Sequence, residues 1–187
     1  MSSFTTLSVV LALLLYVPLC VQLLQGKAKQ NLATWIMWGS LDLIVTITII
    51  VQHGNYFLPA AYVLGCGITL LCMIKFGDLV WTSFESFVAF LVLVCLIVWG
   101  FSGSKIATVA STLAMAIAGI PQLIDCYRRP HGMPFLIYIG YTVANLFSVL
   151  GGKNWSIEER FYPIMAGIYC LLFSALASRK FWVKQPT

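Results

Sequence analysis

Long apolar runs separated by short polar breaks restrict the fold of this chain more than any other feature of its sequence. Seven such runs lie at roughly 4–24, 32–52, 57–74, 84–100, 105–125, 135–150 and 161–178. Each run can cross the hydrocarbon core of a bilayer, about 30 Å thick, as a helix. A helix is the only form open to it, because lipid offers no partner to an unpaired backbone group. The breaks are too short to hold a soluble domain. The sequence therefore predicts an all-α membrane protein with seven transmembrane helices.

The composition agrees with a bilayer as the solvent. The chain is 60% hydrophobic and 9% charged, whereas about a quarter of the residues in a soluble domain are charged. The net charge is +5, but the basic residues are scattered singly between apolar runs, which does not indicate nucleic-acid binding. The six cysteines form no C-x-x-C pair, and His53 and His131 stand alone in breaks, so we expect no metal site and no cofactor.

The distribution of Lys and Arg over the breaks predicts the orientation of the chain. The first, third and fifth breaks and the tail hold eight of them: Lys27, Lys29, Lys75, Arg128, Arg129, Arg179, Lys180 and Lys184. The other side holds three: Lys105, Lys153 and Arg160. Basic residues favour the cytoplasmic side, which places the N-terminus outside and the C-terminus in the cytosol. Short loops and tails without a sorting signal favour a bacterial inner membrane over a eukaryotic endomembrane.

A shift of 103 residues brings the prolines and polar midpoints of two parts of the chain into register. It pairs Pro18 with Pro121, Trp35 with Tyr138, Trp38 with Tyr141 and Asp42 with Asn145. With one added residue, Pro59 falls on Pro163, Cys66 on Cys170 and Lys75 on Arg179. We therefore predict a first three-helix bundle over 1–75, a linker helix over 76–103, a second bundle over 104–180 and a tail over 181–187. Four spans separate equivalent positions, so the two copies are parallel repeats, an arrangement found among secondary transporters.

Two stretches resemble the motif of the PQ-loop and SWEET transporter superfamily. The clearer one is "IPQLIDCYRRPHGMPFLIYIGYTVAN", with Pro-Gln late in one helix and a polar midpoint in the next. The other is "VPLCVQLLQGKAKQNLATWIMWGSLD", which has Leu19 where the family has Gln and places Gln22 one turn later. The resemblance implies a layout of three, one and three helices that covers nearly the whole chain.

The paired prolines are candidates for hinges. A proline inside a helix removes one backbone hydrogen bond and kinks the chain. We expect Pro18 and Pro121 to lie near the cytosolic ends of matched helices, where they could open and close a gate together with Gln22 and Gln122. The alternative is a static kink that only helps packing.

The second and sixth runs carry the candidate substrate site. Trp35, Trp38 and Asp42 stand at i, i+3 and i+7 and therefore share one helix face, and Tyr138, Tyr141 and Asn145 repeat that face. An Asp at mid-membrane is costly, so it faces a cavity or a partner and is a candidate proton carrier. Aromatic faces can hold a cation or the C–H edges of a sugar. Asp125 and Glu85 are the next candidates for the proton.

We therefore expect a transporter of a small cationic or zwitterionic, amino-acid-like metabolite that works by alternating access and is coupled to protons through Asp42. The alternatives are a passive sugar facilitator, in which Asp42 is merely a hydrogen bonder, and a non-transporting receptor or assembly protein on the same fold. A retinal photoreceptor is excluded because Lys180 stands only at the end of the last run. No enzyme motif is present. The expected partners are the solute, protons and the bilayer, and a homo-oligomer stays open.

Overall fold

The computed structural model describes residues 2–27, 32–74 and 83–182, with the Glu85 side chain outside the description. The side chain of the candidate proton carrier Glu85 and the orienting residues Lys29, Lys75 and Lys184 therefore lie outside the described part. The helices are α1 (Ser3–Leu24), α2 (Leu32–Val51), α3 (Phe57–Ile74), α4 (Ser83–Ser102), α5 (Ser104–Ala118), α6 (Ile120–Arg128), α7 (Phe135–Gly151) and α8 (Tyr162–Ser178), with short turns η1 (Pro130–Gly132), η2 (Ile157–Phe161) and η3 (Arg179–Phe181). The described residues contain no β-strand, so the prediction of an all-α fold is confirmed.

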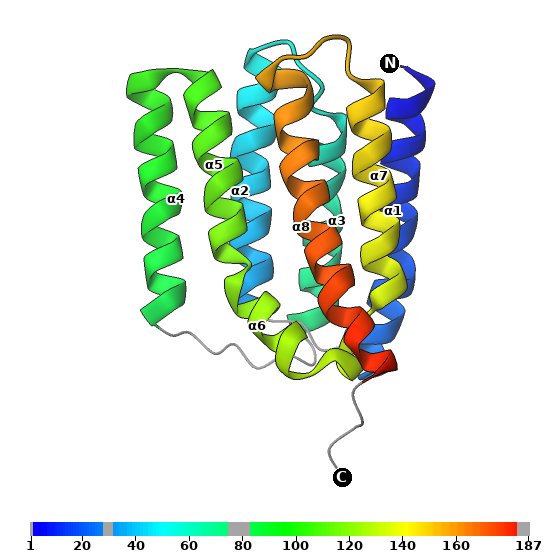
Figure 1. The fold of residues 1–187 in the computed structure, drawn as a ribbon. Helices are drawn as coiled ribbons and strands as arrows, with labels where there is room; N and C mark the ends of the chain where they lie inside the picture. Colours follow the sequence, from blue (N-terminus) through cyan, green and yellow to red (C-terminus); the bar gives the residue numbers. More distant parts are fainter. Residues whose placement is uncertain (1, 28–31, 75–82, 183–187) are drawn as a thin grey trace.

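Six of the helices close into a ring. Helix α3 packs against both α1 and α2, and α8 packs against both α5 and α7. The ring closes because α1 packs against α7 and α2 packs against α5. Helix α4 lies outside the ring, beside α5 at the edge of the bundle (Figure 1). We call α1 to α3 the first half of the ring and α5 to α8 the second half.

The outer surface of the bundle is apolar. Exposed apolar side chains recur at helical spacing, as they do along α1 at Phe4, Leu7, Val10, Leu14, Val17, Val21 and Leu24. Five helical segments in the described part are long and apolar enough to cross a membrane: Ser3–Leu24, Leu32–Val51, Phe57–Ile74, Ser104–Arg128 and Ile157–Phe181. Apolar helices at Ser86–Ser102 and Phe135–Gly151 are shorter. An apolar exterior of this kind indicates a membrane protein, since water would not solvate it.

The fifth predicted span, in which a kink at Pro121 was expected, is divided into two helices. Helix α5 ends at Ala118, and α6 begins at Ile120 with Pro121 in its first turn. Gly119 joins the two, and Figure 1 shows α6 turning away beneath α5. Helix α1 differs because it runs unbroken from Ser3 to Leu24 with Pro18 inside it. The two prolines that the repeat places in register therefore stand in different local structures.

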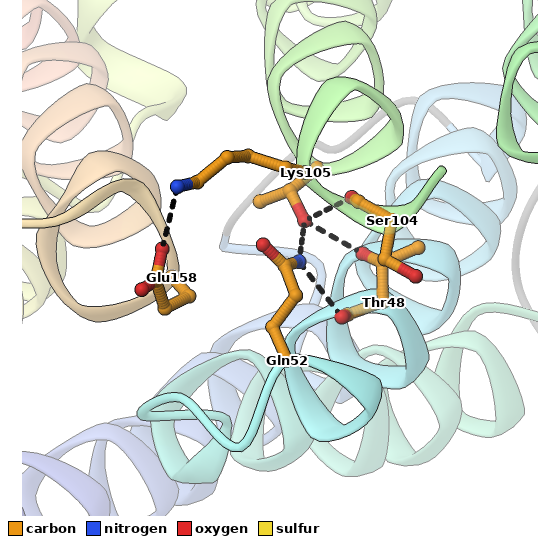
Figure 2. Close-up of polar contacts among 6 residues, drawn as sticks. Thr48, Gln52, Ser104, Lys105 and Glu158 are labelled. Carbon is orange, nitrogen blue, oxygen red and sulfur yellow. Dashed lines mark hydrogen bonds and ion pairs between the residues drawn. The ribbon is translucent and has the colours of Figure 1, made fainter. Parts of the chain in front are cut away.

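Polar contacts tie the two halves together at the end of the bundle where α1 begins, which we call the N-terminal end. Gln52, directly after α2, donates from Nε2 to Thr108 Oγ1 of α5 at 2.9 Å. Within the second half, Lys105 Nζ at the start of α5 lies 3.8 Å from Glu158 Oε2 of η2 (Figure 2). The backbone N–H of Asn55 donates to the Glu158 carbonyl at 3.1 Å. The polar segment at 151–160, which was expected to be a loop, thus contains a helical turn, η2. This turn is hydrogen-bonded to the connection between α2 and α3.

Candidate functional site

A cavity of about 80 Å³ lies at the centre of the ring. All six ring helices contribute to its wall, and α4 contributes none of the described lining residues. The lining residues are Tyr16, Leu19, Trp35, Trp38, Asp42, Tyr62, Cys66, Met115, Pro134, Ile137, Tyr138, Tyr141, Tyr162, Ala166, Tyr169, Cys170 and Phe173. On α2 and α7 they come from the half of each helix that faces away from the N-terminal end. On α3 and α8, by contrast, Tyr62 and Tyr162 come from the half nearer the N-terminal end. The cavity therefore lies in the middle of the bundle, between the N-terminal end and the opposite, C-terminal end.

Five of the six predicted binding residues line this cavity. Trp35, Trp38 and Asp42 reach it from α2, and Tyr138 and Tyr141 reach it from α7. These two helices stand on opposite sides of the ring, since α2 neighbours α3 and α5 while α7 neighbours α8 and α1. The shared helix faces expected from the spacing of these residues thus meet across one space.

Asn145 is the predicted binding residue that does not line the cavity. It is completely buried, and its Nδ2 donates to Tyr62 Oη at 2.7 Å and to the Tyr141 carbonyl at 2.8 Å. Tyr62 lines the cavity, so Asn145 lies one layer behind the wall. Its position orients Tyr62 rather than offering an amide to a solute.

Asp42 is held by a hydrogen bond from the other half of the ring. The Tyr162 hydroxyl of α8 donates to Asp42 Oδ1 at 2.7 Å, and both side chains are buried. The contact between Asn145 of α7 and Tyr62 of α3 also crosses between the halves, but here the polar midpoint belongs to the second half and the tyrosine to the first. The rings of Tyr62 and Tyr162 are neighbours, with centroids 6.3 Å apart. Two reciprocal cross-links therefore join the halves near the middle of the bundle.

Aromatic rings make up most of the remaining wall. Trp38 meets Trp35, Tyr169 and Phe173 edge-on, with ring centroids 5.6, 6.4 and 6.0 Å apart. The ring centroids of Tyr16 and Tyr141 are 5.4 Å apart. The buried hydroxyl of Tyr141 has no hydrogen-bond partner among the described residues. Asp42 is the single carboxylate among the described lining residues. The arrangement suits a solute with one positive charge, which the rings and the carboxylate attract together.

The four candidate hinge residues lie away from the cavity wall. Pro18 is exposed on α1, and Gln22 is half-buried one turn further along. Pro121 is half-buried beside the break between α5 and α6, and the fully buried Gln122 donates from Nε2 to Met133 Sδ at 3.6 Å. These positions suit a role in backbone geometry rather than in contact with a solute. The candidate proton carrier Asp125 of α6 is paired with Arg129, the residue after that helix, at 3.1 Å between Oδ1 and Nη2, outside the cavity lining.

Sequence reasoning missed four tyrosines of the cavity wall. Tyr16, Tyr62, Tyr162 and Tyr169 lie in the first, third and seventh apolar runs. The repeat hid two of them, because its frame places Tyr62 opposite Ala166 and Tyr162 opposite Leu58. A phenol inside an apolar run was the available signal, since a buried Tyr O–H usually needs a partner.

Comparison with known proteins identifies no relative. No family model, no curated protein and no solved structure matches this chain. The functional assignment therefore rests on the residues and the geometry of this chain.

Proposed function

We propose that this chain is a seven-span membrane transporter that moves a small cationic or zwitterionic, amino-acid-like solute by alternating access between the two halves of its ring. The N-terminal end faces the outside and the C-terminal end faces the cytosol, in a bacterial inner membrane. The observation that carries the proposal is the central cavity, in which one buried carboxylate stands among aromatic rings contributed by both halves.

The size and chemistry of the cavity support the choice of solute. A cavity of roughly 150 Å³ can bind benzene, so this one, at about 80 Å³, accommodates only a few heavy atoms unless the helices move apart. The smallest amino acids and amines meet that limit. A positive charge gains from the faces of Trp and Tyr rings and from a carboxylate that lipid-facing positions would not tolerate.

The arrangement of the ring supports alternating access. The contacts α1–α7 and α2–α5 are the two seams between the halves. Near the N-terminal end, side chains bridge the second seam through Gln52 and Thr108, which lie outside the cavity lining. A rocking motion that separates these contacts and closes the C-terminal end would expose the cavity to the outside. Transporters built from repeats alternate access by rocking one repeat against the other around a fixed binding site.

Proton coupling through Asp42 and membership of the PQ-loop and SWEET superfamily are parts of the same proposal. The carboxyl of Asp42 sits where the solute would bind and is bonded across the seam to Tyr162. Gain or loss of its proton changes both its attraction for a cation and the strength of that cross-link. The likeness to the superfamily rests on the Pro-Gln motif and on the three-one-three helix layout.

Counterflow in liposomes tests the proposal. Purified protein is reconstituted into vesicles preloaded with unlabelled glycine, alanine, a short primary amine or glucose, and entry of the matching labelled solute is measured. We expect exchange of a zwitterion or an amine, accelerated by an inward proton gradient. Exchange of glucose alone, without pH dependence, would indicate the passive facilitator instead. Absence of any exchange, with ligand-dependent thermal stabilisation retained, would indicate the receptor.

A further inference from the structure

Two tyrosines of the cavity wall each pack against a glycine on a neighbouring helix. The ring of Tyr16 on α1 lies so close to Gly65 on α3 that a Cβ there would overlap it. At Gly119 a Cβ would likewise overlap the phenol of Tyr169 on α8, and it would also come within 2.7 Å of Trp38 Cζ2. Only glycine permits either approach.

The repeat relates these two contacts with their roles exchanged. The shift of 103 residues places Tyr16 opposite Gly119, and the shift of 104 places Gly65 opposite Tyr169. Each tyrosine hydroxyl also donates to a carbonyl three positions before its glycine. Tyr16 reaches the Tyr62 carbonyl at 3.5 Å, and Tyr169 reaches the Ala116 carbonyl at 2.8 Å.

The exchange gives the two halves different mechanical properties. In the first half the acceptor carbonyl belongs to α3, which is unbroken from Phe57 to Ile74. In the second half it belongs to the last turn of α5, directly before the break at Gly119. Pro121 has no N–H to offer the Ile117 carbonyl. The indole N–H of Trp38 donates to the Met115 carbonyl at 3.1 Å in the same turn.

We propose that Tyr169 and Trp38 position the break between α5 and α6, and that a solute in the cavity releases it by engaging these two side chains. Both side chains line the cavity, so the Tyr169 hydroxyl and the Trp38 indole N–H can bond either to the solute or to the backbone carbonyls of α5. This inference rests on the proposed function. It assigns the moving segment to the second half. The first half, in which Tyr16 bonds to the continuous helix α3, is then the part that stays fixed.

Hydrogen–deuterium exchange in nanodiscs tests the positioning role without a known solute. Tyr169→Phe keeps the ring in the cavity wall and removes the donor to the Ala116 carbonyl. We expect the amides of 119–123 to exchange about fivefold faster, the factor typical of one lost hydrogen bond. Tyr16→Phe is the matched control and should leave these amides unchanged. Equal exchange of 119–123 in wild type and Tyr169→Phe, or an equal effect of both variants, would overturn the inference.

Counterflow separates this inference from the proposed function. With the solute that wild type exchanges, Tyr169→Phe should change the maximal rate by several-fold and raise the half-saturation concentration, because the lost hydroxyl serves both the break and the solute. Faster amide exchange together with an unchanged maximal rate would overturn the link between cavity and break. If wild-type protein moves no solute at all, the proposed function falls, and the amide exchange alone decides whether Tyr169 positions the break.

Discussion

At the scale of single residues, the two cross-links in the middle of the bundle differ in how well their polar atoms are satisfied. Asp42 accepts one hydrogen bond, from Tyr162, through its side chain. The amide nitrogen of Asn145 donates both to Tyr62 and to the carbonyl of Tyr141 one turn earlier, while its Oδ1 has no hydrogen-bond partner among the described residues. Loss of the Tyr162 hydroxyl would therefore destabilise the protein more than loss of the Tyr62 hydroxyl. A buried carboxyl without a hydrogen-bond partner is costly, whereas the Asn145 amide nitrogen would keep one partner.

Paired Tyr→Phe substitutions test this difference. Tyr162→Phe should lower the free energy of unfolding by about 1–3 kcal/mol, the cost of a buried polar group that loses its partner. Tyr62→Phe should cost less, because Asn145 Nδ2 keeps the Tyr141 carbonyl. The measurement is thermal or denaturant unfolding of the purified variants in one detergent. A larger loss for Tyr62→Phe than for Tyr162→Phe would contradict this reading of the two contacts.

Removal of the carboxylate tests the proton-coupling role. Asp42→Asn keeps an acceptor for Tyr162 and removes the group that can carry a proton. Solute exchange should survive, whereas acceleration by an inward proton gradient should disappear. Asp125→Asn is the control, because Asp125 is paired with Arg129 outside the cavity lining. Solute uptake by this variant should still depend on the proton gradient. Gradient-driven uptake that persists in Asp42→Asn would place the proton on another group.

At the scale of the helices, the two prolines act on different backgrounds. The sequence alone predicted a kink at each, because a missing N–H has the same local consequence at Pro18 and Pro121. The outcome differs through the residue two positions before each proline: Tyr16 stands in a continuous α1, whereas Gly119 stands at the break after α5. The close approach of Tyr169 and Trp38 that requires glycine there is a tertiary contact, and local sequence rules carry no information about it.

Proline replacement tests which helix moves. Pro121→Ala restores an N–H that can bond the Ile117 carbonyl and so favours a straight helix from α5 into α6. We expect slower counterflow with normal folding, as judged by thermal stability. Pro18→Ala adds a hydrogen bond to a helix that is already continuous and should leave counterflow near the wild-type rate. A greater slowing by Pro18→Ala would move the hinge to the first half.

At the scale of the whole molecule, the apolar runs predicted the helices but not their order around the ring. Runs of about twenty apolar residues form helices in lipid whatever their neighbours, which explains why boundaries such as 57–74 agree with α3. The order α1, α3, α2, α5, α8, α7 depends on which helix faces complement one another. It brought α2 and α7 to opposite sides of the cavity and placed Asn145 behind Tyr62, neither of which follows from spacing along one helix.

The orientation of the bundle is tested by cysteine labelling in intact cells. Ser2 and Trp182 are exposed at opposite ends of the described chain. A membrane-impermeant maleimide should label Ser2→Cys from outside and leave Trp182→Cys unlabelled until the membrane is permeabilised. The unsubstituted protein, with its native cysteines, sets the background. Labelling of Trp182→Cys alone in intact cells would reverse the proposed orientation.

The most direct test of a solute site inside the ring is protection of Cys170, which lines the cavity. In a Cys66→Ala background, the rate at which a small thiol reagent modifies Cys170 is measured with and without the solute identified by counterflow. At 100 times its dissociation constant, a solute that occupies the cavity should slow the modification about a hundredfold. Cys72, half-buried on α3 and outside the cavity lining, is the internal control and should react at an unchanged rate. An equal rate of Cys170 modification with and without solute would contradict a binding site at the centre of the ring.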